Sequence, residues 1–337
     1  MLIEKNKSLR EYNTFGIDVL AKAFVSIKSE EELSALLKAY RPKDLFILGG
    51  GSNLLFTSNL DKLVVHINLK GIGVASETDE EVILEISAGE NWHDLVMHCI
   101  DQGYGGIENL SLIPGNTGTA PIQNIGAYGV ELKDVFVSCR AVEIKSGKTL
   151  EFSKDDCKFG YRNSIFKNEL KGKFIITSVR LRLTKQDHKL NTSYGAISDI
   201  LAENNIVEPS IKDISEAVIT IRQSKLPDPN VLGNSGSFFK NPVLDKSNFL
   251  AFQNKFPEAP YYEVSDTEFK VPAGWLIEEA GFKGKRFGDA GIHEKQALVL
   301  VNHGTASGKE IWELAQRIQK RVKVLFDIDI EPEVNVI

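Results

Sequence analysis

The first 68 residues alternate between helical and extended hydrophobic patterns. Ser29 forms a capping-box pattern with Glu32, and a helix is predicted to follow because apolar side chains recur at helical spacing, at Leu33, Leu36, Leu37 and Tyr40. Short apolar runs at 45–48 and 64–67 have the length of buried strands. The pattern therefore predicts a small α/β lobe over residues 1–68.

Residues 69–223 show a second pattern, in which extended segments rich in Val, Ile, Phe and Leu predominate. Strands are predicted near 82–87, 135–144 and 174–183, and helices near 92–102 and 211–223. We expect this second lobe to be α+β, with much antiparallel pairing.

A third region begins where Pro227 and Pro229 interrupt the helical pattern. It contains a predicted helix at 272–280, a strand at 297–302 and a long helix after Ser307, whose capping-box partner is Glu310. The predicted fold class is therefore α+β with three domains, of which the third covers residues 224–326.

Charge and composition exclude some classes of function. The chain has 337 residues and a formal net charge of −6, with Lys and Arg scattered along it. This distribution gives no electrostatic footprint for nucleic acid or for an anionic membrane. The N-terminal residues lack the apolar core of a signal peptide, and no run is long enough to span a bilayer, so we expect a cytoplasmic protein.

The cysteines and histidines do not predict a metal site. Cys99, Cys139 and Cys157 are widely separated, which favours buried thiols over a zinc site or a redox pair. His93 and His98 lie on different faces of their predicted helix, and the other histidines are isolated. No residue is therefore assigned to a metal.

Two glycine-rich loops carry the clearest chemical signal. Residues 49–53, Gly-Gly-Gly-Ser-Asn, follow a predicted strand and suit either an anion-binding nest or a simple tight turn. Residues 112–129 form a long loop with almost no charge. Its backbone N–H groups and hydroxyls suit a pyrophosphate, and Gln123 and Asn124 suit a heteroaromatic edge. The first loop lacks Rossmann spacing and the chain has no Walker A motif. The chemistry of the second loop makes a dinucleotide cofactor the natural candidate.

Six segments follow one another in a recognisable order: GGGSNLL at 49–55, IPGNTGTAPIQNIGAYG at 113–129, YRNSIFK at 161–167, GSFFKNP at 236–242, PAGWLIEEAGFKG at 272–284 and HEKQALVLVN at 293–302. Together they resemble the UDP-N-acetylenolpyruvoylglucosamine reductase (UDP-N-acetylmuramate dehydrogenase) family, type I. The resemblance covers nearly the whole chain.

The resemblance implies the FAD-binding fold of the vanillyl-alcohol-oxidase (PCMH) type. Two lobes hold FAD, a third domain binds the UDP-sugar, and residues 327–337 return to the first lobe. The implied FAD contacts are Gly49, Gly50, Gly51, Ser52, Asn53, Ile113, Pro114, Gly115, Gly118, Thr119, Ala120, Gln123, Asn124, Gly126, Ala127, Tyr128 and Gly129. The FAD is expected to be non-covalent, because no His or Cys lies near either loop to tether it.

The family's reaction is the reduction of UDP-N-acetylglucosamine enolpyruvate to UDP-N-acetylmuramate in peptidoglycan synthesis, with NADPH as the reductant and FAD as the hydride carrier. Arg162 matches the cation that stabilises charge at the substrate carboxylate, and Ser237 matches the donor of the proton to C2. Glu333 matches the C-terminal glutamate that orients the substrate or the proton relay. Asn335 departs from the family pattern, because many members carry Arg there.

The resemblance also implies contacts with the nucleotide sugar. The matching residues are Tyr161, Tyr194, Lys225, Asn241 and Tyr262, of which Tyr161 is expected near the flavin. A lysine offers a point charge for pyrophosphate, and tyrosines offer aromatic faces with polar tips. Residues 243–271, which include Tyr262, are similar to the loop that type I members close over the substrate.

Two other functions remain open at this point. One is an FAD-linked oxidase or dehydrogenase of the same superfamily, and the other is a catalytically silent nucleotide-binding homologue. The absence of a tethering histidine near the glycine-rich loops, together with the presence of Arg162, Ser237 and Glu333, favours the reductase. We expect a monomer whose partners are small molecules.

Overall fold

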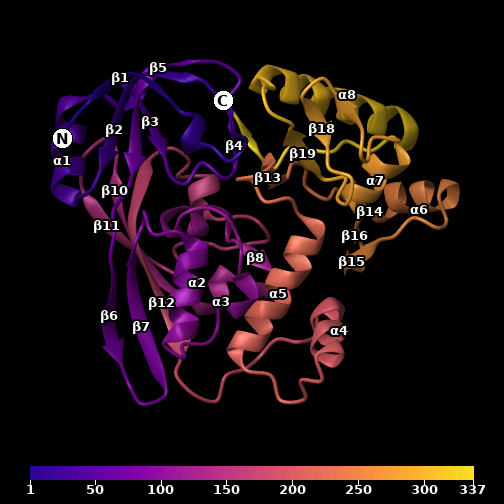
Figure 1. Cartoon of the computed structure of the whole chain (residues 1–337), viewed down its shortest axis with the longest axis horizontal. Coiled ribbons are helices and arrows are strands. Elements are labelled where there is room, and N and C mark those ends of the chain that lie inside the picture. The colour runs from indigo at the N-terminus through magenta and orange to yellow at the C-terminus, as the bar shows by residue number, and fades with distance from the viewer. The chain divides into compact units, whose positions relative to one another are not determined.

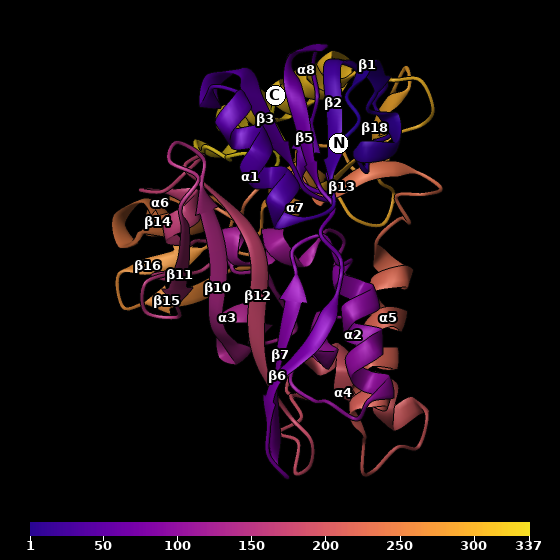
Figure 2. The ribbon, with the colours of Figure 1, turned by 90° about the vertical axis from the view of Figure 1, so that its left-hand side faces the viewer.

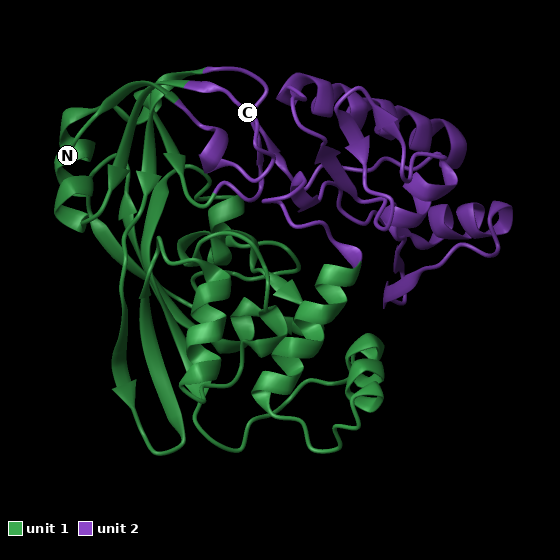
Figure 3. Cartoon of the chain, viewed as in Figure 1, with its two compact units in different colours: residues 1–7, 21–50, 60–224 green, residues 8–20, 51–59, 225–337 purple.

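The computed structural model describes residues 1–337, which form two compact units (Figure 3). The first unit contains residues 1–7, 21–50 and 60–224, and the second contains residues 8–20, 51–59 and 225–337. Helices and strands occur together in both units, as the predicted α+β class requires. No helix of the chain combines the length and the apolar character needed to cross a membrane.

The first unit begins with a four-stranded sheet in the order β1-β2-β5-β3 (Figure 1). The strands are β1 (Glu4–Ser8), β2 (Leu20–Ile27), β3 (Leu45–Leu48) and β5 (Leu60–Ile67), and β5 is parallel to both neighbours. Parallel strands need a crossover, which α1 (Glu30–Ala39) provides between β2 and β3. Its buried leucines share one hydrophobic core with this sheet. The strand β3 has the predicted bounds, whereas β5 begins four residues earlier than residue 64.

The N-terminus of α1 differs from the predicted capping box in one detail. The Ser29 hydroxyl accepts a hydrogen bond from the Glu32 N–H at 3.2 Å, as expected. The Glu32 carboxylate, however, accepts from the N–H of Lys28 at 2.8 Å rather than from that of Ser29. The helix start is still capped, because two N–H groups at this end find acceptors.

A five-stranded antiparallel sheet forms the larger part of the first unit, in the order β11-β10-β12-β7-β6 (Figure 2). Its strands are β6 (Ile72–Glu77), β7 (Glu81–Ser87), β10 (Phe136–Glu143), β11 (Thr149–Ser153) and β12 (Phe174–Thr184). The helix α2 (Trp92–Asp101) shares a hydrophobic core with this sheet. The predicted antiparallel pairing is therefore confirmed.

Two further helices complete the first unit. They are α4 (Gly195–Glu203) and α5 (Ile211–Lys225), and their apolar sides form a small separate core. Tyr128, from the second glycine-rich loop, packs against this core. The helix pair therefore supports one end of that loop.

The second unit is built on an antiparallel sheet in the order β13-β19-β18-β17. Its strands are β13 (Gly233–Ser237), β17 (Arg286–Phe287), β18 (Ala290–Ile292) and β19 (Val299–Asn302). The helices α7 (Ala273–Glu279) and α8 (Gly308–Phe326) belong to the same unit. The predicted capping box of α8 is present, with Ser307 and Glu310 bonded in both directions.

Residues 243–270 of the second unit are fully folded. They form β14 (Val243–Asp245), α6 (Lys246–Lys255), β15 (Tyr262–Ser265) and β16 (Glu268–Lys270), and the three strands pair antiparallel in the order β14-β16-β15. At the end of the chain, β20 (Asn335–Val336) pairs in parallel with β4 (Leu54–Leu55). The last residues therefore lie beside the segment that follows the first glycine-rich loop.

Candidate active site

The second glycine-rich loop is more regular than its sequence predicts. A 3₁₀ helix spans Thr117–Gln123, and β8 (Gly126–Ala127) then pairs with β9 (Val130–Glu131), ahead of α3 (Leu132–Val135). The start of the 3₁₀ helix is tied to residues before α2, because Thr117 and Gly118 donate backbone hydrogen bonds to Glu90 and Ala88. The run of glycines and small residues did not predict this regular structure, because such residues are common both in turns and in flexible loops.

Strained backbone conformations concentrate at this loop. Leu112, Asn124 and Tyr128 have positive φ angles of 59°, 44° and 50°, and Arg162 has a φ of 52°. These angles lie in the left-handed region, which costs a non-glycine residue roughly 1–3 kcal/mol. Surrounding hydrogen bonds must therefore hold the loop in place.

Asn124 supplies three of those bonds. Its amide nitrogen donates to the Glu131 carboxylate at 3.0 Å and to the Gly160 carbonyl at 3.1 Å, and its amide oxygen accepts from the Lys133 N–H at 3.0 Å. The side chain is fully buried. These hydrogen bonds make Asn124 an anchor of the loop. Its contact with a heteroaromatic edge stays a prediction.

The two glycine-rich loops approach each other closely within the first unit. A Cβ built on Gly49 would lie 2.5 Å from Cγ2 of Thr119, and one built on Gly50 would lie 2.7 Å from the Asn116 side-chain oxygen. No real side chain tolerates such distances without displacing its neighbours. A Cβ on Gly50 would also lie 3.0 Å from the Cα of Gly115. Glycine at these positions therefore lets the first loop pass close to the second, and such close approach is one of its uses beside a ligand.

The remainder of residues 49–53 belongs to the second unit. Gly51 has a φ of +65°, and a Cβ there would lie 2.0 Å from the carbonyl oxygen of Tyr12. The Gly51 carbonyl accepts a hydrogen bond from Thr14 N–H, and Ser52 and Asn53 are half-buried. The carbonyl of Asn53 is bonded to both the backbone and the side chain of Asn335, at 3.1 and 3.0 Å. The residue that departs from the family pattern thus fastens β20 beside β4.

The other predicted cofactor residues differ in how much solvent reaches them. Gly118, Ala120 and Gly126 are buried, Gly115, Thr119 and Gln123 are half-buried, Ile113 and Ala127 pack against the core of the five-stranded sheet, and Pro114 and Gly129 are exposed. The loop thus combines a buried, structural side with residues that remain accessible.

Arg222 is a candidate site residue that the sequence motifs did not single out. It lies on α5, shares a side-chain hydrogen bond with Tyr128, and has a buried Nε atom without a hydrogen-bond partner. Burial lowers the pKa of this guanidinium, although Tyr128 opposes that effect, and burial raises the pKa of the Tyr128 hydroxyl. An orphaned, charged donor of this kind fits a bound anion.

Tyr128 also contacts one of the predicted substrate residues. Its ring meets that of Tyr194 edge to face, with centroids 5.2 Å apart, and about half of the Tyr194 surface is exposed. Asn109 contacts the same segment: its amide nitrogen donates to the carbonyls of Tyr128 and Asn191, while its buried side-chain oxygen lacks a partner. Together with the close glycine contacts and the Arg222 Nε, these groups fit a dinucleotide such as FAD.

Arg162 lies next to the same loop. Its guanidinium donates a hydrogen bond to the carbonyl of Gly126 and lies 5.7 Å from the centroid of the exposed Tyr161 ring. Lys167 donates to the Arg162 carbonyl at 3.0 Å, which helps to hold the left-handed conformation. Arg162 is therefore positioned by both its backbone and its side chain.

Ser237 lies at the exposed end of β13, after an irregularity in the pairing with β19. The turn before it is held by buried Asn234, whose side chain donates to the carbonyls of Pro227 and Leu232 and accepts from Gly236 N–H. Immediately after it, Phe238 and Phe239 are fully buried. The hydroxyl is thus presented from a rigid main chain, and Asn234 is a positioning residue that the sequence motif did not single out.

Glu333 is joined to the same main chain. Its N–H donates to the carbonyl of Phe238 at 2.8 Å, and the Lys240 N–H donates to Glu331 at 2.9 Å. The carbonyl of Glu333 accepts from the side chain of Asn53 at 3.3 Å. The second unit therefore brings Ser237 and Glu333 together, whereas Arg162 belongs to the first unit.

The remaining substrate predictions fall on three separate elements. Asn241 accepts a hydrogen bond from Ala273 N–H at the start of α7, so its side-chain oxygen caps that helix. Tyr262 is an exposed residue of β15, with the Lys270 ammonium 5.9 Å from its ring centroid. Lys225 is exposed at the last position of α5.

Comparison with known proteins places these features in context. Residues 21–153 match the family model of an FAD binding domain, and residues 228–337 match that of the UDP-N-acetylenolpyruvoylglucosamine reductase C-terminal domain. The UDP-N-acetylenolpyruvoylglucosamine reductase of Flavobacterium johnsoniae is 60% identical over the full length of both chains, and that of Amoebophilus asiaticus is 48% identical, also over both full lengths. The crystal structure of this reductase from Thermus caldophilus has the same fold, with a TM-score of 0.71, 24% identity, and coverage of 100% of this chain and 99% of that one.

The match to an FAD binding domain and the full-length relatives define the chain as an oxidoreductase of the FAD-binding flavoproteins. Within that class, the chain belongs to the UDP-N-acetylenolpyruvoylglucosamine reductase family. The resemblance inferred from the six ordered motifs is thereby confirmed.

Proposed function

We propose that this chain reduces the enolpyruvyl ether of UDP-N-acetylglucosamine enolpyruvate to the lactyl ether of UDP-N-acetylmuramate, using NADPH, as a step in peptidoglycan precursor synthesis. The observation that carries this function is the 60% identity with a UDP-N-acetylenolpyruvoylglucosamine reductase over the full length of both chains. Bound FAD would supply the hydride transfer, from NADPH to the C3 atom of the enolpyruvyl group.

Ser237 is the proposed proton donor to C2. A serine hydroxyl is a weak acid, so the role depends on a strongly basic acceptor and on accurate positioning. The bonds that Asn234 makes to the preceding turn, together with the buried Phe238 and Phe239, support such positioning. Glu333, whose N–H is bonded to the carbonyl of Phe238, is proposed to orient the substrate carboxyl or the hydroxyl of Ser237.

Arg162 is the proposed partner of the substrate carboxylate. Hydride addition at C3 builds negative charge at C2 and on the carboxylate, and a fixed guanidinium stabilises that charge with planar donors. Its bond to Gly126 and its left-handed backbone fix the guanidinium before substrate arrives. Pre-organisation of this kind removes the cost of reorienting a charge during the reaction.

The residues proposed to hold FAD are those of the two glycine-rich loops, with Arg222 added. Backbone N–H groups of Gly49–Asn53 and of residues 113–129 suit the pyrophosphate, and the unpartnered Arg222 Nε supplies a nearby positive charge. Non-covalent binding is proposed, because neither loop contains a cysteine or histidine. Flavin that stayed with the polypeptide after acid precipitation would contradict this.

The predicted assignment of FAD and the UDP-sugar to separate domains also remains a proposal. Residues 1–68 with 327–337 and residues 69–223 would hold FAD, and residues 224–326 would bind the UDP-sugar through Lys225, Asn241 and Tyr262, with Tyr194 from the second lobe. Two hydrophobic clusters in the first unit support two lobes there, and the cluster under the four-stranded sheet also takes in Val142, Ile144 and Ile175 from the five-stranded side. The pairing of β20 with β4 supports the return of the C-terminus. We also propose a cytoplasmic monomer without nucleic-acid or membrane partners.

The test is an anaerobic absorbance experiment on the purified, flavin-loaded protein. NADPH is added until the oxidised flavin band is lost, and UDP-N-acetylglucosamine enolpyruvate is then mixed in. Rapid return of the band is the expected result, and it establishes both half-reactions. Loss of the band with no return after this substrate would exclude the proposed acceptor while retaining a flavoprotein. A protein that takes up no FAD would overturn the proposal entirely.

A further inference from the structure

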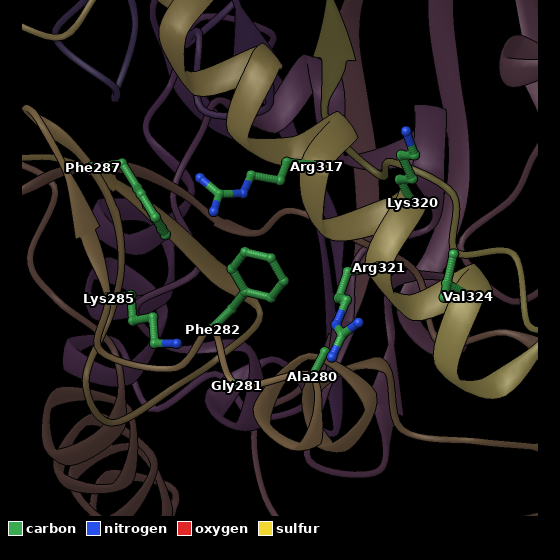
Figure 4. A pocket seen from close by; sticks show the side chains of 9 residues that line it. All are labelled: Ala280, Gly281, Phe282, Lys285, Phe287, Arg317, Lys320, Arg321 and Val324. Atoms are coloured by element: carbon green, nitrogen blue, oxygen red, sulfur yellow. The ribbon is translucent and has the colours of Figure 1, made fainter.

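The second unit contains a pocket that none of the predicted site residues lines. It lies between α8 and the turn that follows α7, and its volume is about 530 Å³ (Figure 4). The lining residues are Ala280, Gly281, Phe282, Lys285, Phe287, Arg317, Lys320, Arg321 and Val324. Pockets of roughly 300–1,000 Å³ accommodate small organic ligands and cofactors.

The charged side chains that line this pocket are all positive. Its lining includes four cations, Lys285, Arg317, Lys320 and Arg321, and no carboxylate. None of these four forms an ion pair with Asp or Glu, unlike neighbouring Lys283 and Arg286, which pair with Glu278 and Asp289. Glu279, which precedes Ala280, has no such pair, but the four lining cations outnumber it. The pocket therefore has a net positive potential, which attracts anions.

The aromatic residues give the pocket a preformed shape. The Phe282 side chain is only 6% exposed, so its ring is a fixed wall. The Arg317 guanidinium lies 4.6 Å from the centroid of the Phe287 ring. A guanidinium stacked on a ring keeps its N–H edges available in its own plane, which suits bidentate recognition of a phosphate.

Three of the cations lie around the buried Phe282 ring. The Arg317 guanidinium is directed toward Phe287, and that of Arg321 toward Ala280. In Figure 4, Phe282 lies between Arg317 and Arg321, Lys285 extends toward it from the turn, and Lys320 is turned away. Arg317, Arg321 and Val324 share one face of α8, because they are spaced by four and three residues. Cations in the last turn of a helix commonly stabilise its dipole, but Arg317 and Lys285 lie outside that turn.

We propose that this pocket binds a nucleoside diphosphate. Its phosphates would be held by Lys285, Arg317 and Arg321, and its base would pack against Phe282, Phe287 and Val324. A multiply charged phosphate matches the three lining cations, and a planar base matches the apolar wall. This site is additional to the reductase function and does not depend on it.

The proposal is tested by calorimetric titration of the flavin-loaded full chain with ADP. The double variant R317Q/R321Q removes two charges but keeps most of the side-chain length, and K309Q removes an exposed charge of the same helix that does not line the pocket. We expect R317Q/R321Q to weaken ADP binding at least roughly tenfold, because two charge-assisted contacts are lost. K309Q should bind as the wild type does, and reductase turnover without ADP should be unchanged in both variants.

A second measurement uses the wild-type protein and is therefore independent of how the variants fold. ADP should protect Lys285 from acetylation but leave Lys309 reactive. Equal ADP affinity in R317Q/R321Q, or no protection of Lys285, would overturn the proposal. Adenosine should fail to bind and inorganic pyrophosphate should bind more weakly than ADP. Pyrophosphate binding as tight as that of ADP would exclude the proposed role of the aromatic wall.

Discussion

The loop at 112–129 and the segment around Ser237 differ in the hydrogen bonds that hold them in shape. In the loop, side chains hold a strained backbone: Asn124 makes three buried hydrogen bonds, and the His93 ring accepts the N–H of Leu112. Around Ser237, main-chain hydrogen bonds join Phe238 to Leu298 and Glu333 to Phe238, and the Asn234 side chain holds the residues before Ser237. The loop thus depends on side-chain hydrogen bonds for its shape, whereas the main chain that carries Ser237 is held by groups other than the Ser237 side chain.

This difference separates the residues that carry out the reaction from the residues that maintain the fold. A substitution at Ser237 should change the reaction and leave the fold intact. A substitution in the glycine-rich loops should disturb the fold first and flavin binding as a consequence. The predictions below test this separation.

Replacing the hydroxyl of Ser237 should have the largest effect on activity. In S237A, return of the oxidised flavin band on addition of the enolpyruvyl substrate should slow by about 10²- to 10⁴-fold, because a positioned proton donor is lost. Reduction by NADPH and the melting temperature should be unchanged, since the side chain is exposed. Normal turnover in S237A would show that the proton comes from another group.

Gly51 should show the largest effect on stability. In G51A a new Cβ would lie 2.0 Å from the Tyr12 carbonyl oxygen at a φ of +65°, so we expect a loss of about 3 kcal/mol or more in the free energy of unfolding. Gly16 is the matched control, because it has the same φ and no atom would lie within 4 Å of a Cβ added there. G16A should lose only about 1–2 kcal/mol, measured by urea unfolding. Equal losses in both variants would mean that the Tyr12 contact contributes nothing.

Replacing Asn124 tests whether side-chain hydrogen bonds hold the loop at 112–129. In N124A the Glu131 carboxylate, the Gly160 carbonyl and the Lys133 N–H each lose a partner, and we expect a loss of about 2–3 kcal/mol in the free energy of unfolding. Flavin affinity should fall in parallel. The control is N168A, whose amide is also bonded but exposed, and which should lose about 0.5 kcal/mol or less. Full flavin affinity in N124A would show that the loop holds its shape without these bonds.

The sequence predicted helices and strands well where the hydrophobic pattern was long or where a capping residue marked the start of a helix. The helix α8 begins after the predicted Ser307 cap, and β12 follows the predicted segment 174–183 with one added residue. The roles of Asn241 and Arg222 were not predictable in this way. An asparagine that caps a helix 32 residues away, and an arginine buried with an unpartnered Nε, depend on tertiary placement that local spacing does not encode.

Protonation of His93 should have the smallest effect of the four, a loss of flavin affinity at acidic pH. Its Nδ1 accepts the Leu112 N–H at 3.1 Å, which requires the neutral ring, and burial lowers its pKa, with Arg222 lowering it further and Asp94 opposing. Because the folded pKa lies below the ordinary value of about 6.5, the bond's contribution is fully present above that pH and is lost as the pH falls through the folded pKa. Flavin affinity should therefore weaken as the pH falls below the ordinary histidine pKa of about 6.5, by roughly threefold or less because the ring is half-exposed. H93Q should remove this decline, since a glutamine oxygen accepts the same N–H without titrating, while H98Q, at an exposed site on α2, should retain it. A decline of equal size in H93Q, measured by flavin fluorescence, would assign the acid sensitivity to another group.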